Sequence, residues 1–150
     1  MDRVKRAEAY FLQGYNCSQA VFAAFADRYG MDETTALRLT STLGGGIASR
    51  REVCGALNAL SMICGLEIGG SEVNHELKKA SYRGNRELLE EFESQYGSIL
   101  CRELLAKAKK KPEKDPAERT AEYYAGRPCL AYVRAAAEIL ERHFPEEKGE

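Results

Sequence analysis

Apolar residues recur three and four positions apart along most of this chain, and no segment alternates apolar and polar residues as a strand does. Residues at that spacing share one face of an α-helix, which has about 3.6 residues per turn. The sequence therefore predicts an all-α fold with no significant sheet. A chain of 150 residues, 44% of them hydrophobic, can bury one core but not two comfortable ones. We expect a single-domain helical bundle of about six to eight helices over residues 1–150.

Capping and helix-breaking residues divide the pattern into candidate helices. In chain order we expect a helix over about 2–13, one that Asn16 caps and Gly30 ends, one that Asp32 caps, one over 51–66, one over 71–96, one that Ser98 caps, one over 117–124 and one that Pro128 begins. The helix over 51–66 is apolar on more than one face and is expected to be central. The polar stretch at about 107–116 is expected to be a solvated loop, and about 145–150 a flexible tail.

The charge balance excludes several classes of partner. Net charge is −1 and the pI is about 6.2, so no excess of basic residues attracts nucleic acid or an anionic membrane. No window approaches the ~18 apolar residues of a membrane span, and the first residues lack the apolar block of a signal peptide. We expect a cytoplasmic protein with no nucleic-acid or membrane partner.

The five cysteines, at positions 17, 54, 64, 101 and 129, are too few and too far apart for the common local motifs. No CxxC or CxxCH occurs, which excludes a haem-attachment motif, a thioredoxin-like motif and a zinc knuckle. In a reducing cytosol such residues remain thiols, bind a metal or form a reversible redox pair.

Four of the cysteines share one position relative to the expected helices. Cys17, Cys54, Cys101 and Cys129 each fall in the first turn of a different helix. The unpaired N–H groups and positive dipole end at that position stabilise a thiolate and lower its pKa from about 8.5. Cys64 lies ten residues after Cys54, about 15 Å along the same helix, so both cannot serve one site. The alternative is that all are small core residues, as free cysteines often are.

Weaker candidates for ligand contacts surround Cys54. The triple glycine contains Gly45 and Gly46 but lacks a phosphate-loop signature, so we expect a turn that brings backbone close to Cys54. Gly55 and Asn58 follow the cysteine, and a buried Asn58 amide could hydrogen-bond a sulfur or a bound ligand. The two histidines, at positions 75 and 143, are expected at the surface.

The segments GYNCSQAV, LGGGIASRREVCGAL, SILCRELL and RPCLAYV together resemble the redox-active family named for its C_GCAxxG_C_C cysteine pattern. The family's four cysteines correspond one by one to Cys17, Cys54, Cys101 and Cys129, and Cys64 has no place in the pattern. The central box departs from the strict pattern, because Val53 precedes the cysteine. The resemblance implies a small, helical, soluble, redox-active protein, and it implies no particular substrate.

Three functions remain open on the sequence. The first is thiol–disulfide or electron-transfer chemistry with an unknown redox partner, in which Cys54 or Cys17 is the attacking thiolate. The second is a Cys₄ site for an iron–sulfur cluster or zinc formed by the same four cysteines. The third is a helical binding or assembly module with structural cysteines. Aromatic residues expected to be exposed, namely Tyr10, Phe11, Tyr123 and Tyr124, leave room for a homodimer.

Overall fold

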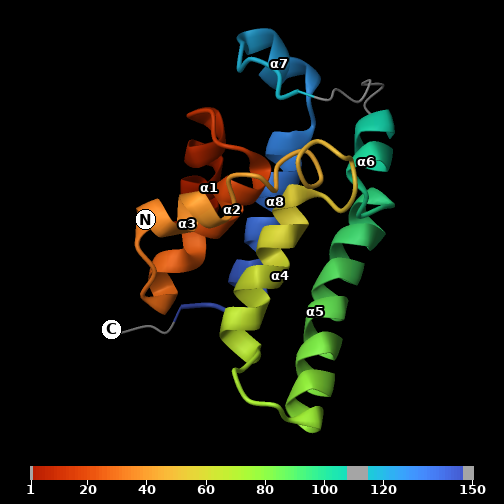
Figure 1. The fold of residues 1–150 in the computed structure, drawn as a ribbon. Coiled ribbons are helices and arrows are strands. Elements are labelled where there is room, and N and C mark those ends of the chain that lie inside the picture. Colours follow the sequence, from red (N-terminus) through yellow and green to blue (C-terminus); the bar gives the residue numbers. More distant parts are fainter. Residues whose placement is uncertain (1, 108–114, 147–150) are drawn as a thin grey trace.

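The computed structural model describes residues 2–107 and 115–146, and within them the protein is all-α, as predicted. The described residues form eight α-helices and one 3₁₀ helix with no strand (Figure 1). The helices are α1 (Arg3–Leu12), α2 (Cys17–Ala26), α3 (Glu33–Leu39), α4 (Gly55–Ile68), α5 (His75–Tyr96), α6 (Cys101–Lys107), α7 (Ala121–Gly126) and α8 (Cys129–His143), with the 3₁₀ helix η1 (Asp27–Tyr29) between α2 and α3.

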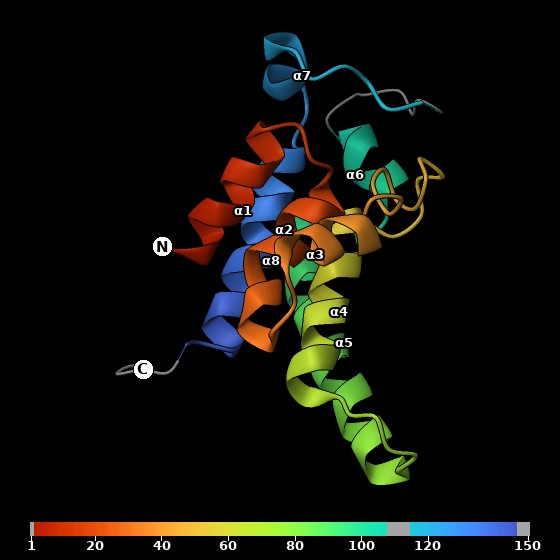
Figure 2. The same cartoon turned by 60° about the vertical axis from the view of Figure 1, so that its left-hand side comes forward.

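Two helices, α2 and α4, form the centre of the bundle. Helix α2 packs against α1, α3, α4 and α8, and eight of its ten residues are buried. Four of these are alanines, which let neighbouring helices approach closely. The sequence predicted α4 as the central helix, and α4 is buried on several sides as expected, but α2 is surrounded more completely. Figures 1 and 2 show α4 and α5 side by side as an antiparallel pair, with α7 at the opposite end of the molecule from the turn that joins them.

Local capping explains where most helices begin and end. Asn16 caps α2 in a reciprocal pair with Gln19, and Asp32 caps α3, both as predicted. Four predicted starts are wrong. The helix expected from 51 begins at Gly55; the helix expected from Ser71 begins at His75, because the Asn74 side chain accepts the Leu77 N–H; and the helix expected over 117–124 is α7, capped by Thr120. Pro128 is expected to be the first residue of α8, but it immediately precedes that helix. The predicted end of α5 at Gly97 is confirmed, and Gly97 has a left-handed φ of 83°.

The predicted 51–66 helix starts late because residues 45–51 form a left-handed turn. Gly45 and Gly46 have φ of 66° and 71°, and Ile47, Ala48, Ser49 and Arg51 also have positive φ. Side-chain-bearing residues in this region cost about 1–2 kcal/mol each, so other contacts must hold the turn. Its N–H groups donate back to the carbonyls of residues 42–47, which closes the loop on itself.

The chain leaves this left-handed turn through a single antiparallel bridge between Val53 and Leu100. The Cys54 N–H donates to the Ile99 carbonyl at 2.9 Å, and the Cys101 N–H donates to the Glu52 carbonyl at 2.7 Å. This pairing joins the start of α4 to the start of α6, so it brings together two cysteine segments that are far apart in sequence.

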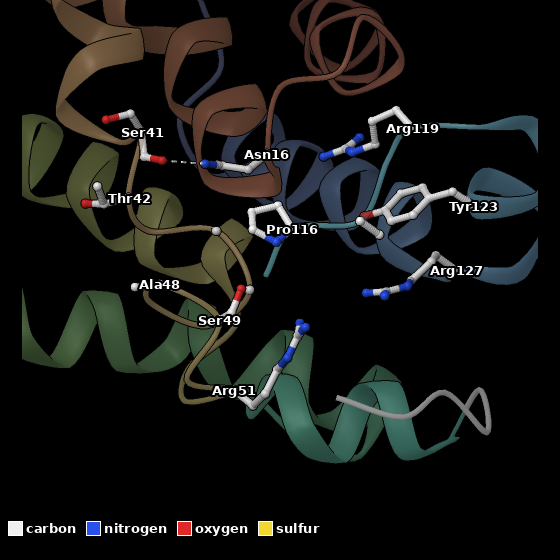
Figure 3. Close-up of a pocket in the computed structure, with 13 residues that line it drawn as sticks. Asn16, Ser41, Thr42, Ala48, Ser49, Arg51, Pro116, Arg119, Tyr123 and Arg127 are labelled. Atoms are coloured by element: carbon white, nitrogen blue, oxygen red, sulfur yellow. Dashed lines mark hydrogen bonds between the residues drawn. The ribbon is translucent and has the colours of Figure 1, made fainter. Parts of the chain in front are cut away.

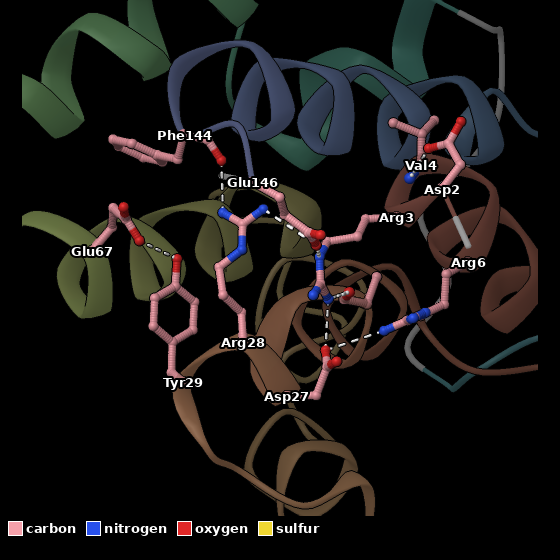
Figure 4. A network of polar contacts seen from close by, with 11 residues as sticks. Asp2, Arg3, Val4, Arg6, Asp27, Arg28, Tyr29, Glu67, Phe144 and Glu146 are labelled. Carbon is pink, nitrogen blue, oxygen red and sulfur yellow. Dashed lines mark hydrogen bonds and ion pairs between the residues drawn. The ribbon is translucent and has the colours of Figure 1, made fainter. Parts of the chain in front are cut away.

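A cluster of ion pairs joins both ends of the described chain to η1 (Figure 4). The buried Arg3 guanidinium donates to Asp27 at 2.6 Å and to the Ala24 carbonyl at 2.8 Å, and it also contacts Glu146. Arg6 contacts Asp27 as well, at 3.1 Å. We call these side chains the terminal ion-pair cluster; it fixes the start of α1 against the end of α2.

The remaining sequence predictions have mixed outcomes. Residues 108–114 and 147–150, which fall in the predicted loop and tail, lie outside the described residues. Phe11, expected to be exposed, is 2% exposed and belongs to the core, because its ring packs beneath Tyr124. His75 and His143 are exposed, as predicted. Within the described residues, no helix combines the length and apolar character that a membrane span requires.

Candidate functional site

The four cysteines of the predicted set lie at the N-terminal ends of four helices and line one cavity. Cys17, Cys101 and Cys129 are the first residues of α2, α6 and α8, and Cys54 immediately precedes α4. All four contribute to a cavity of about 60 Å³, which we call the cysteine cavity. Cys54 and Cys101 are buried, whereas Cys17 and Cys129 are half-buried. Cys64 lies deep in the core away from this cavity, as predicted.

Cys17 has the strongest set of hydrogen-bond donors. The Cys54 thiol and the backbone N–H groups of Gly45, Ala56 and Ser18 lie near its sulfur and favour its thiolate form. Two of these N–H groups belong to helix N-termini, those of α2 and α4, where the helix dipole favours negative charge. The hydrogen bond from Cys54 and the three N–H groups outweigh burial and lower the pKa of Cys17 to about 6.

Cys54 is the protonated member of this pair. Its pKa is raised well above the ordinary value, first because its thiol donates to the Cys17 sulfur and then because it is buried. The two thiols therefore titrate as a pair, in which the surroundings of Cys17 favour the thiolate and those of Cys54 favour the thiol.

Gly55 makes this close approach possible. A Cβ at position 55 would lie 2.7 Å from the Cys17 sulfur and 3.0 Å from the Leu43 carbonyl oxygen, both far inside normal contact. Only glycine at the first position of α4 lets the Cys17 sulfur reach the amide groups of that helix. This gives a physical reason for a small residue directly after Cys54.

The other two thiols lie beside arginine side chains. A guanidinium nitrogen of Arg51 is 3.7 Å from the Cys101 sulfur. Burial raises the pKa of Cys101, and the hydrogen bond and charge of Arg51 oppose that rise. Burial also raises the pKa of Cys129 to about 12, with the charge on Cys17 adding to the effect. Cys101 and Cys129 are thus protonated thiols beside one thiolate.

The weaker sequence candidates divide into three outcomes. Gly45 does bring backbone to a cysteine, but to Cys17 rather than Cys54. Gly46 lies against the backbone of residues 51 and 52 rather than against a cysteine. The Asn58 amide nitrogen donates to the Val53 carbonyl at 3.0 Å and to the Cys54 carbonyl at 3.4 Å, so the amide is satisfied by backbone at the start of α4, and its role toward a ligand stays a prediction.

Sequence reasoning missed the residues that cover the cysteine cavity. Arg51, Arg119, Arg127 and Tyr123 line it together with Tyr132, whose hydroxyl donates to the Leu104 carbonyl at 3.2 Å. Two of these arginines had a signal in the sequence, since Arg51 lies three residues before Cys54 and Arg127 two before Cys129. Arg119 lies in a polar segment with no cysteine nearby, and only the fold brings it to the site.

A metal site needs its ligands around one centre. Among residues 2–107 and 115–146, no group of three or more His, Cys, Asp or Glu side chains is arranged to hold a metal ion. As placed, the four thiols therefore do not form the ligand set that an iron–sulfur cluster or zinc requires.

Comparison with known proteins agrees with the position of the cysteines. No curated protein and no solved structure matches the chain. One protein family does match, and the match runs from residue 15 to residue 143, which includes all four cysteines of the cavity. The chain therefore belongs to the family described as "Putative redox-active protein (C_GCAxxG_C_C)".

Proposed function

We propose that this protein carries out thiol–disulfide exchange, with Cys17 as the attacking thiolate and Cys54 as the resolving thiol. The observation that carries the proposal is that Cys17 and Cys54 line one cavity, where Gly55 lets the Cys17 sulfur lie against the N-terminus of α4 directly after Cys54. A low-pKa thiolate beside a protonated thiol is the arrangement that exchange chemistry uses.

The reaction needs only a disulfide as its second reactant. The Cys17 thiolate attacks one sulfur of the substrate disulfide, the substrate S–S bond breaks, and one substrate thiolate leaves. Cys54 then gives its proton to that thiolate and attacks the Cys17 sulfur, which breaks the mixed disulfide and releases the second substrate thiolate. The protein loses two electrons and ends with a Cys17–Cys54 disulfide, and the substrate gains two electrons and becomes one thiol and one thiolate.

The amide groups around Cys17 favour attack at this residue rather than at Cys54. They stabilise the thiolate in the resting protein, and a thiolate with a pKa near 6 is ionised at neutral pH while remaining nucleophilic. Once Cys17 is in a mixed disulfide, its negative charge is gone. Cys54 then loses the anion that raised its pKa, so it becomes easier to ionise at the step that requires it.

Trapping the intermediate tests the proposal. The fully reduced protein is mixed with bis(hydroxyethyl) disulfide, and the products are identified by intact mass and peptide mapping. We expect the unaltered protein to finish as an internal Cys17–Cys54 disulfide. Cys54→Ser should stop at the mixed disulfide on Cys17, because the serine hydroxyl still donates to the thiolate but cannot resolve the bond. Cys17→Ser should react at least about tenfold more slowly, since the remaining thiols are protonated.

Cys64→Ala is the matched control, since it removes a cysteine outside the cysteine cavity and should react as the unaltered protein does. Equal rates for Cys17→Ser and the unaltered protein would reject the proposal and favour structural cysteines. Near-stoichiometric iron or zinc in anaerobically purified protein, lost in Cys54→Ser, would also reject it in favour of a metal site.

A further inference from the structure

A second, larger pocket lies directly outside the cysteine cavity. It has a volume of about 330 Å³ and lies between residues 41–51 and residues 116–127 (Figure 3). Six residues line both spaces, namely Asn16, Gly45, Arg51, Arg119, Tyr123 and Arg127. The larger space, which we call the outer pocket, therefore borders the cavity that holds the thiols. Its volume suits a small molecule rather than a protein segment.

The described lining of the outer pocket is positively charged. It contains Arg51, Arg119 and Arg127, and among the described residues no aspartate or glutamate lines it. Figure 3 shows Arg51 extending from the left-handed turn, and Arg119 and Arg127 from the opposite side, with their guanidinium groups directed toward the same space. Clefts lined by one sign of charge concentrate ligands of the other sign.

Arg119 is held in place independently of any ligand. Its guanidinium donates to the Tyr15 carbonyl at 2.8 Å and the Phe11 carbonyl at 3.1 Å, and it lies 4.4 Å from the centre of the Phe11 ring. Arg127 lies over the Tyr123 ring at 5.0 Å. Carbonyls and rings thus set the positions of these guanidinium groups, a group type that binds carboxylates with two parallel hydrogen bonds.

The charge of Arg127 also affects the pKa values of two thiols in the cysteine cavity. Burial raises the pKa values of Cys101 and Cys129, and the charge of Arg127 opposes the rise at both. A negative group bound among these arginines would therefore lie within electrostatic reach of the thiols, at the entrance to the cavity where Cys17 reacts.

We propose that the outer pocket binds the carboxylate groups of a small disulfide and presents its S–S bond to Cys17. This inference names the substrate class of the exchange reaction proposed above and rests on it. Small disulfides with carboxylates are then preferred over neutral and cationic ones, and the arginines supply the preference.

Three disulfides that differ mainly in charge provide the test: dithiodipropionate, bis(hydroxyethyl) disulfide and cystamine, which carry two negative, no and two positive charges. We expect the reduced protein to react about tenfold faster with the anion than with the neutral compound, and slowest with the cation. Added salt should reduce the differences among the three exchange rates, because it screens the charges of the arginines and of the disulfides. Arg127→Gln should slow the anionic reaction more than the neutral and cationic ones, and Arg127→Lys should retain part of the preference because it keeps the charge. Arg86→Gln, on the exposed face of α5, is the matched control and should change nothing.

Alkylation gives a readout that does not require exchange. Cys17 is alkylated with iodoacetate, which is an anion, and with iodoacetamide, which is neutral. The ratio of the two rates, divided by the same ratio for the denatured protein, measures how strongly the pocket attracts an anion. A ratio raised about tenfold and lowered in Arg127→Gln supports the anion pocket, even if no disulfide reacts and the proposed function fails. Exchange at equal rates with all three disulfides, together with an unchanged alkylation ratio, would overturn the inference while leaving the exchange function intact.

Discussion

Substituting two glycines of α4 with alanine tests whether contact at Gly55 sets the chemistry of Cys17. Gly55 and Gly65 are in the same helix, but their surroundings differ. A Cβ at position 55 would lie 2.7 Å from the Cys17 sulfur and 3.0 Å from a backbone carbonyl oxygen, whereas a Cβ at position 65 would have no atom within 4 Å.

The two changes should alter stability in opposite directions. Gly65→Ala removes glycine's excess backbone entropy in a helix without a clash, so it should raise the free energy of unfolding by about 0.5–1 kcal/mol. Gly55→Ala overpacks a buried contact in which the backbone carbonyl cannot easily move. Overpacking of this kind costs about 1–3 kcal/mol, so the protein should be less stable despite the better helix former. Denaturant unfolding of both variants measures the two values.

Gly55→Ala should also reduce the reactivity of Cys17. Moving the sulfur away from the N-terminus of α4 weakens its hydrogen bond from the Ala56 N–H. A hydrogen bond to a charged group contributes about 1.5–3 kcal/mol, and each 1.4 kcal/mol corresponds to about a tenfold change in equilibrium. The pKa of Cys17 should therefore rise from about 6, and its alkylation by iodoacetamide at pH 7, which follows the thiolate fraction, should slow by about two- to tenfold. Gly65→Ala should leave that rate unchanged.

The reasoning fails if Gly55→Ala is as stable as the unaltered protein and Cys17 keeps its reactivity. That result would mean that the sulfur does not depend on close approach to α4. Loss of stability with unchanged Cys17 reactivity would also refute it, because the clash would then act on packing alone.

Three further changes test other parts of the fold. Asn16→Ala removes the cap of α2 and should cost about 1–2 kcal/mol by denaturant unfolding while also slowing Cys17 alkylation; Asn74→Ala, at the cap of α5, should cost a similar amount without that effect. Ala48→Gly should leave stability unchanged or raise it by up to about 1 kcal/mol, because φ is 50° there, whereas Ala80→Gly in α5 should cost about 1 kcal/mol. At Asp27, burial raises the pKa, but the neighbouring guanidinium groups outweigh it and hold the pKa below its ordinary value. The stability that Asp27 contributes should be fully present above about pH 4 and lost as pH falls further. The gap in unfolding free energy between the unaltered protein and Asp27→Asn should therefore shrink between pH 6 and pH 3, and a constant gap would contradict this assignment.

The sequence predicts the helices well where a local signal decides. The period of three and four identifies them, and Asn16 and Asp32 cap the helices expected of them. The start of α5 shows the limit of such signals. Ser71 and Asn74 are both good caps, and the pattern alone cannot select Asn74, whose side chain accepts the Leu77 N–H.

The candidate site was predictable in its cysteines but not in its surroundings. Four helix N-termini carrying cysteines indicate a shared site, and placing Cys64 elsewhere needs only the rise of a helix. The partners of each sulfur depend on contacts between distant segments. The approach of Gly45 to Cys17 requires a left-handed turn, and that of Arg51 to Cys101 requires pairing between segments about fifty residues apart, so neither has a local signature.

The left-handed turn is the element that connects these thiols. It donates the Gly45 N–H to Cys17, contributes Arg51 to Cys101, and leads through the bridge at Val53 directly to Cys54. Three consecutive side-chain-bearing residues with positive φ would together cost several kcal/mol in isolation. The hydrogen bonds that the turn makes to the carbonyls of residues 42–47, together with its contacts to the thiol segments, offset that cost.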